Sequence, residues 1–349
     1  MNKYVRHAIF YYLITGLLGV CCVQNSYAQD IHFSQFFAAP LLVNPAFSGL
    51  YHGDFRITGN VRQQWKSISE PFTTSAIGAD YQFYRSNGDR ISAGMQISSD
   101  EAGVGTLKTT QTYVVGAYHK SVGLNDFHGG LQFGYVEQGV DIKKFSFPNQ
   151  FDRDLGQFNS QNDALPNGES NLQEKTQYID VAIGFAWSRD FGQLKPIVGF
   201  SIYHLNFPHK TLTENDEARA KPRPVITYGG IYTLNQRYYL MPLFKYTFQT
   251  KSSDLLFGSN VARVIPRNKF KLDAAYAGME FRTGVGRNTD ASIFMLGLIF
   301  KKLRVGMSYD FNISSLRTSS SYRGATEISI IYTGLSTQLD RAHIPCNRY

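Results

Sequence analysis

The chain has 349 residues with a formal net charge of +8; 18% of its residues are charged, 14% are aromatic and 31 are glycine. Charged residues are scarcer than the roughly 25% of a typical soluble domain, and a hydrophobic content of 43% is too high for a disordered chain. After the first 28 residues, no run approaches the roughly 20 apolar residues of a membrane-spanning helix. These figures exclude a helical membrane bundle and favour a β-rich chain. Lysine and arginine form no dense cluster, so nucleic acid is not expected as a partner.

Residues 1–28 have the parts of a secretory signal peptide. Lys3 and Arg6 give a positive start, a mostly apolar stretch follows, and small residues occupy the −3 and −1 positions. Cleavage is therefore expected between Ala28 and Gln29. An uncleaved anchor is the less favoured alternative, because the apolar stretch is short and an acceptable cleavage site follows it.

Two of the three cysteines, Cys21 and Cys22, lie inside the signal. A lipidated cysteine is the alternative there, but Val20 stands where such a site needs a small residue. Cleavage would leave Cys346 alone, so we expect neither an intramolecular disulfide nor a cysteine-based metal site.

The dominant pattern after the signal has a period of two. In 91–98, 181–188 and 303–312, apolar side chains alternate with polar or small ones. Such alternation predicts strands with one apolar face, whereas a helix would distribute both kinds around its circumference. No segment of the mature chain has a convincing amphipathic helical pattern.

Runs of this kind number about fourteen, and most are near the roughly 9–11 residues of a tilted membrane-spanning strand. An even number suits a bacterial outer-membrane barrel. Two runs, 107–120 and 269–282, alternate poorly and leave the count open by two. The runs are 53–66, 71–84, 90–98, 107–120, 127–138, 176–188, 193–203, 223–234, 238–250, 253–262, 269–282, 291–300, 302–313 and 325–333.

The connections between these runs predict an orientation. The two longest, 139–175 and 204–222, fall on the same side of the expected barrel, and short turns such as 85–89 fall on the other. Outer-membrane barrels have short periplasmic turns and long outer loops. We therefore expect the first strand to rise from the periplasm.

A soluble sandwich, propeller or lipocalin could show similar alternation. No repeat has a blade-like period, and aromatic residues such as Tyr81, Phe83, Tyr246 and Phe248 gather at the ends of runs, as interfacial girdles do. An apolar outer face on this many strands would aggregate in water, and in lipid the backbone must close on itself.

The predicted fold is therefore an all-β, transmembrane, antiparallel up-and-down β-barrel of about fourteen strands with an irregular periplasmic N-terminal leader. The expected organisation is a signal peptide at 1–28, a periplasmic leader at 29–52, the barrel at 53–333 and a C-terminal periplasmic tail at 334–349.

Residues that could carry chemistry form no recognised pattern. The eight histidines include no HxxxH pair, and Asp152 and Asp154 lack the glycine and glutamate of a calcium loop. No GxSxG elbow is present. We therefore expect no catalytic, cofactor-binding or metal-binding residues.

The leader is apolar but has no period. Pro40 and Pro45 oppose both a helix and a strand ladder, and Asn44-Pro45 favours a turn. So apolar a segment has to be buried, and two places are open: the barrel lumen, where it would be a plug, or a periplasmic partner.

Several motifs occur in the order of a known family. The opening Phe33-Ser34-Gln35-Phe36-Phe37, followed by Pro40, Asn44-Pro45-Ala46 and Gly49, resembles the signature of the PorP/SprF family of Bacteroidetes. Weaker matches follow at Arg62-Gln63-Gln64-Trp65, Pro71–Thr74, Ser99-Asp100-Glu101-Ala102-Gly103, Tyr309-Asp310 and Glu327-Ile328. The last six residues depart from the Cys-Pro-aromatic ending of many members. The candidate partner-contact residues on this basis are Phe33, Ser34, Gln35, Phe36, Pro40, Asn44, Pro45, Gly49, Gln64, Trp65, Asp100 and Gly103.

The resemblance implies an outer-membrane barrel, surrounded by lipid, that belongs to the type IX secretion system. It implies association with periplasmic secretion subunits and binding of a secreted cargo or adhesin through its C-terminal domain, for export or surface anchoring, as in gliding motility. It brings neither catalytic residues nor cofactors. On this view the loops 139–175 and 204–222 engage the cargo and the leader faces the periplasmic machinery. The alternatives are a passive porin or small-solute channel and an outer-membrane barrel enzyme.

Overall fold

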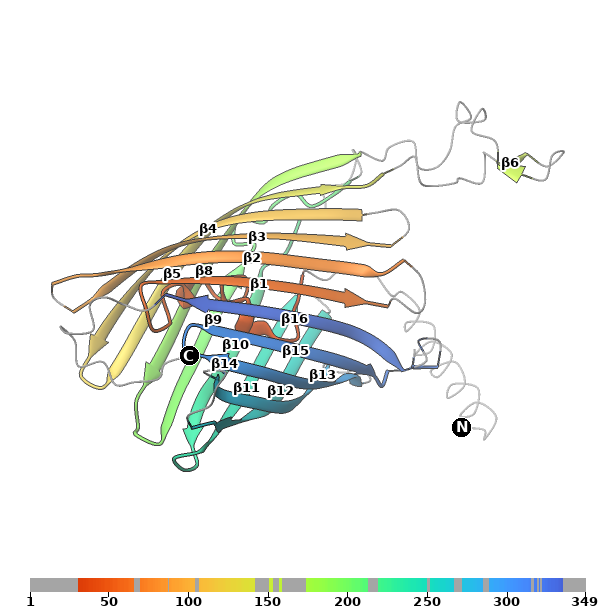
Figure 1. Cartoon of the computed structure of the whole chain (residues 1–349). Coiled ribbons are helices and arrows are strands. Elements are labelled where there is room, and N and C mark those ends of the chain that lie inside the picture. The colour runs from red at the N-terminus through yellow and green to blue at the C-terminus, as the bar shows by residue number, and fades with distance from the viewer. Residues whose placement is uncertain are drawn as a thin grey trace, which may run out of the picture. The chain divides into compact units, whose positions relative to one another are not determined.

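Fourteen antiparallel strands close into one barrel in the computed structural model (Figure 1). Each strand pairs with its neighbours in the chain, and β1 closes the barrel against β16. The structure describes residues 31–65, 70–86, 88–103, 107–141, 151–152, 157–158, 174–212, 219–249, 252–266, 272–284, 289–314, 317–318, 320 and 322–334. The predicted signal peptide, its cleavage site, and the tail after residue 334 lie outside these residues.

The barrel strands match the fourteen expected runs one for one. They are β1 (Phe55–Gln64), β2 (Phe72–Tyr84), β3 (Arg90–Ala102), β4 (Leu107–Val122), β5 (Asn125–Gly139), β8 (Lys175–Arg189), β9 (Leu194–Tyr203), β10 (Arg223–Thr233), β11 (Tyr238–Gln249), β12 (Ser252–Val264), β13 (Leu272–Thr283), β14 (Thr289–Phe300), β15 (Leu303–Asn312) and β16 (Arg323–Thr333). The poorly alternating 107–120 and 269–282 are both true strands. The connection from β5 to β8 also contains a short hairpin of β6 (Phe151–Asp152) and β7 (Gln157–Phe158), which the alternation pattern does not predict.

Side chains on the strands are distributed opposite to those of a soluble protein. Large apolar residues such as Ile77, Phe133 and Leu296 are exposed on the outer face, while polar and charged residues such as Arg62, Asp310 and Glu327 are buried inside. This arrangement suits a barrel with a lipid-facing exterior. On β15 it confirms the expected faces, since Met307 is exposed and Asp310 is buried.

Two ends of the barrel can be told apart. The strand ends joined by the connections 140–174 and 204–222 are both at what we call the long-connection end, and the strand ends joined by short turns such as 123–124 are at the short-turn end. Among the described residues, no helix is long and apolar enough to cross a membrane.

The chain before β1 forms three short 3-10 turns, η2 (Phe36–Ala38), η3 (Pro40–Leu42) and η4 (Pro45–Phe47). Each proline stands at the first position of its turn, where the missing N–H costs nothing. The Asn44 side chain accepts a hydrogen bond from Ala46 N and so begins η4. The irregular leader predicted from the prolines is confirmed.

Candidate functional site in the barrel lumen

Residues 31–52, which we call the plug, lie inside the barrel (red in Figure 1). Most of their side chains are buried, including Phe33, Gln35, Leu41 and Asn44. In the lumen, Phe36 and Val43 pack in one apolar cluster with barrel residues Tyr203, Val225, Leu243, Leu256, Ile293 and Met295. Of the two places open to the leader, the structure shows the lumen. That the leader faces the periplasm stays a prediction.

The first part of the plug binds a charged cluster on β1, β13, β15 and β16. The backbone N–H groups of Ser34 and Gln35 donate to the two oxygens of Glu327, at 2.8 and 2.9 Å. The Ser34 hydroxyl accepts from Arg62 Nη1 at 2.6 Å and donates to Asp310 Oδ1 at 3.0 Å. The plug therefore completes the hydrogen bonding of groups that would otherwise be costly to bury.

Within this cluster, two guanidinium groups alternate with two carboxylates. Arg62 lies 2.8 Å from Asp310 and 3.3 Å from Glu327, and Arg282 lies 3.0 Å from Asp310. Arg282 also donates to the Ser34 hydroxyl. All four side chains are buried. Buried charges are costly unless they are paired and hydrogen-bonded, and here the plug supplies part of that hydrogen bonding.

The middle of the plug rests on β5, β8 and β9. Asn44 Nδ2 donates to the carbonyl oxygens of Phe185 and Phe200, at 3.0 and 3.3 Å. Two strand glycines allow this approach: a β-carbon on Gly184 would overlap Asn44 Oδ1, and one on Gly130 would overlap the Pro45 backbone. Glycine is therefore required here by close contact rather than by a turn.

The last part of the plug is held at the short-turn end. Gly49 N donates to Asp80 Oδ2 at 2.7 Å, and Arg56 binds both oxygens of the same carboxylate, at 3.0 and 2.8 Å. Arg56 Nη2 also donates to the Phe47 carbonyl at 2.9 Å. The Tyr51 hydroxyl donates to the Asp80 carbonyl at 2.7 Å.

The plug has a direction along the barrel. Ser34 contacts Asp310 and Glu327 near the long-connection ends of β15 and β16, whereas Gly49 contacts Asp80 near the short-turn end of β2. The plug therefore begins at the long-connection end and crosses the lumen to the opposite end, where β1 starts.

The remaining candidate residues lie at the rim of the long-connection end. Trp65 packs edge-to-face on Phe72, with ring centroids 4.8 Å apart, and the Trp65 backbone N–H donates to the Gly324 carbonyl. Trp65 has a φ of 61° and Gly103 a φ of 69°, so both lie in the left-handed region. A β-carbon on Gly103 would lie 3.7 Å from the Phe72 ring, which places these residues in one corner. A left-handed φ is sparsely populated by residues other than glycine and is often found at functional sites.

The twelve candidates thus form two groups. Eight are in the plug: Phe33, Ser34, Gln35, Phe36, Pro40, Asn44, Pro45 and Gly49. Gln64, Trp65, Asp100 and Gly103 are at the rim, where Asp100 accepts a hydrogen bond from Thr74. Gln64 connects the two groups: its side-chain oxygen accepts a hydrogen bond from the Arg62 guanidinium, which also donates to the Ser34 hydroxyl. Whether any of the twelve contacts a partner stays a prediction.

Arg56, Asp80 and Arg282 also bind the plug but are not among the residues predicted from the sequence. A signal was available, because each is a charged residue at a lumen-facing position of a predicted strand. Charge at such a position requires a partner in a narrow barrel. Among the described residues, no group of three or more His, Cys, Asp or Glu could hold a metal ion.

A closed fourteen-stranded barrel with an apolar exterior and a polar, filled interior defines the class: an outer-membrane barrel with an internal plug. The family follows from its sequence. The family model for the type IX secretion system membrane protein PorP/SprF matches residues 25–332, so the chain belongs to the PorP/SprF family. Its place is the cell outer membrane. No curated protein matches the chain.

Solved barrels share the architecture only distantly. The toluene transporter TbuX of Ralstonia pickettii is 10% identical at a TM-score of 0.48, over 84% of this chain and 92% of its own. BamA from Haemophilus ducreyi lacking POTRA domains 1–3 is 7% identical at a TM-score of 0.42, over 80% of this chain and 70% of its own. At these values neither supports an inference about function.

Proposed function

We propose that this protein is a non-enzymatic component of type IX secretion. It binds a secreted cargo or adhesin at the long-connection end, helps to export or anchor it, and associates with periplasmic secretion subunits at the short-turn end. The observation that carries this proposal is the plug. A barrel whose interior is occupied by its own chain offers its loops and strand ends, rather than its bore, to other molecules.

The passive porin is the alternative that the plug opposes. A porin needs a water-filled lumen, but here Phe36, Val43 and the residues around them form an apolar cluster inside the barrel. Arg304 is stacked between Phe37 of the plug and Tyr276 of β13, with its guanidinium carbon 4.6 Å from each ring centroid. These contacts fill part of the lumen with apolar and stacked side chains, which supports a binding role over passive conduction.

The rim corner supports the cargo-binding half of the proposal. Trp65 and Phe72 present two aromatic rings held by a constrained backbone at the end where the long connections lie. Rigid aromatic residues often dominate the free energy of protein–protein binding.

The test is retention of a cargo C-terminal domain by the full-length barrel in detergent. Trp65→Gly removes the ring and permits the left-handed backbone. The matched control is Trp187→Phe, which alters the other tryptophan, located near the short-turn end. We expect the first variant to weaken retention about tenfold or more, as a hot-spot residue would, and the control to leave it unchanged. Equal retention by wild type, Trp65→Gly and a deletion of 142–173 would contradict cargo binding at this end.

A further inference from the structure

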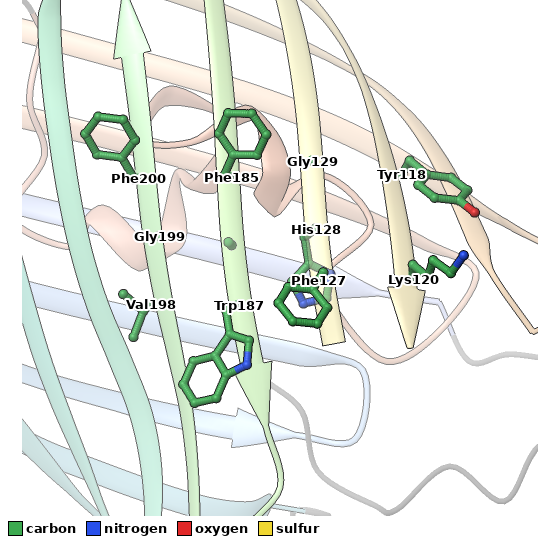
Figure 2. A pocket seen from close by; sticks show the side chains of 11 residues that line it. Tyr118, Lys120, Phe127, His128, Gly129, Phe185, Trp187, Val198, Gly199 and Phe200 are labelled. Carbon is green, nitrogen blue, oxygen red and sulfur yellow. The ribbon is translucent and has the colours of Figure 1, made fainter. Parts of the chain in front are cut away.

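A groove of about 610 Å³ lies in the outer wall of β4, β5, β8 and β9 (Figure 2). Its lining is almost entirely apolar, with the rings of Tyr118, Phe127, Phe185 and Trp187 around it. The rings in Figure 2 project from the outer surface of the strands. Phe127 and Phe185 are 50% and 55% exposed, which places the groove on the face that lipid covers rather than in the lumen.

Strand register explains the shape of the groove. Tyr118 pairs with Gly129, Gly129 with Phe185, and Phe185 with Phe200. These four residues therefore form one row across the outer face. The next row, nearer the short-turn end, contains Lys120, Phe127, Trp187 and Val198. Gly129 is the one position of the first row without a side chain, so it leaves a notch between the Tyr118 and Phe185 rings.

The notch is open space, and no neighbouring residue of the protein requires a glycine at this position. A β-carbon built on Gly129 meets nothing within 4 Å. This distinguishes it from Gly130, the next residue, whose β-carbon would overlap the plug. Packing within the protein therefore does not account for the absence of a side chain at Gly129.

Groups suited to a lipid headgroup lie beside the groove toward the short-turn end. Lys120 is exposed on the outer face of β4 and lines the groove. Arg189 ends β8, two residues beyond Trp187, and its guanidinium lies 4.7 Å from the Phe191 ring centroid. The Trp187 indole N–H donates to Asn125 Oδ1 at 3.1 Å. Tryptophan with nearby cations is typical of the boundary between hydrocarbon and headgroups.

We propose that this groove is a specific phospholipid site: one acyl chain lies in the Gly129 notch between the aromatic rings, and the phosphate lies near Lys120 and Arg189. A β-strand of a partner cannot add here, because the backbone groups of these four strands are already paired in the closed barrel. The width of one missing side chain suits a polymethylene chain, and the cations suit an anionic phosphate. The orientation expected from loop lengths places the groove in the periplasmic leaflet.

Native mass spectrometry of the full-length barrel tests the proposal. The protein is stripped of lipid in detergent and titrated with phosphatidylglycerol. Gly129→Leu fills the notch, and Gly59→Leu is the matched control: Gly59 is also in the outer face, on β1, a β-carbon there meets nothing within 4 Å, and its row neighbours are Ile77 and Ile330. We expect wild type and Gly59→Leu to retain one phospholipid through gas-phase activation, and Gly129→Leu to lose it.

A smaller variant and a charge variant complete the test. Gly129→Ala should weaken retention less than leucine does, and it remains informative if Gly129→Leu fails to fold as judged by heat-modifiable mobility. Lys120→Gln should lower the affinity for phosphatidylglycerol about tenfold, because it removes a charge-assisted contact to phosphate. Equal retention by wild type and both Gly129 variants, or retention of only lipid A or an acylated peptide by the wild type, would overturn the proposal.

Discussion

Asp310 lies between the guanidinium groups of Arg62 and Arg282 and also accepts from the plug hydroxyl of Ser34. Asp310→Asn keeps the shape but leaves two buried cations with one carboxylate fewer. Breaking a buried pair from one side costs roughly 3–5 kcal/mol, so we expect a loss of that order in the free energy of unfolding. Urea titration in liposomes measures it. Asp100→Asn is the control, since Asp100 is only half-buried and bonded to Thr74; an equal loss there would show that the cluster has no special role.

Val305 lies on the lipid face of β15, between Arg304 and Gly306, and is opposite Leu298 and Ile330 on the neighbouring strands. Val305→Arg should cost roughly 2–4 kcal/mol in barrel stability, measured by the same titration, while Val305→Leu should cost little. If arginine were tolerated as well as leucine, the run would not be a membrane strand.

The lumen-facing neighbour on this strand shows a limit of sequence reasoning. Ser308 is at a polar position of the alternation, where a water-filled lumen would accept a large side chain. The structure places its hydroxyl 3.4 Å from Gln35 Nε2 of the plug and buries it to 1% exposure. An arginine there has no space, because the space is filled by a segment 273 residues earlier in the chain. Alternation predicts the face of a residue but not what occupies that face.

At the scale of elements, most of the fourteen strands could be predicted from their own period-two pattern, whereas 107–120 and 269–282 alternate poorly and left the count open by two. The ends of the strands are harder to predict from the sequence. β3 extends to Ala102, beyond the expected residue 98, through Asp100 and Glu101. Those residues belong to the rim, where both faces of the strand are polar. The irregular leader followed from its prolines, but its location did not, since it depends on partners spread over β1, β2, β13, β15 and β16.

Apart from the chain that leads into β1, the plug contacts the barrel through hydrogen bonds and packing that involve side chains. It supplies no ladder hydrogen bond between strands. Deleting residues 31–49 should therefore leave a closed barrel that still migrates as folded in cold detergent, while opening a conducting path. Single-channel recording in planar bilayers should show no steady current for wild type and a clear one for the deletion. A deletion protein that never folds would instead make the plug part of barrel assembly.

A point variant tests the effect of displacing the plug without removing it. Gly184→Val directs a side chain at Asn44, whereas Gly59→Val directs one at lipid. We expect the first to show intermittent current and the second to resemble wild type. Silence from the deletion and from Gly184→Val alike would mean that the lumen is sealed by something other than residues 31–49.

For the molecule as a whole, the long connections and the start of the plug lie at one end of the barrel. With long connections outside the cell, the beginning of the plug also points outward. The mature chain then descends through the lumen before β1 rises. The short turns then face the periplasm, and contact between the leader and periplasmic subunits stays a prediction.

Epitope accessibility on intact cells tests this orientation. Tags placed within 150–170 or directly before Ile31 should both bind antibody from outside. The first site is in a connection between strands at the long-connection end, and the second is where the plug begins at that end. A tag at Gly88, in the turn from β2 to β3 at the opposite end, should bind only after the outer membrane is permeabilised. Labelling at Gly88 but not within 150–170 on intact cells would reverse the barrel and place the proposed cargo surface in the periplasm. External labelling within 150–170 with a protected tag before Ile31 would keep the barrel orientation but show that the plug does not begin at the outer mouth in the cell.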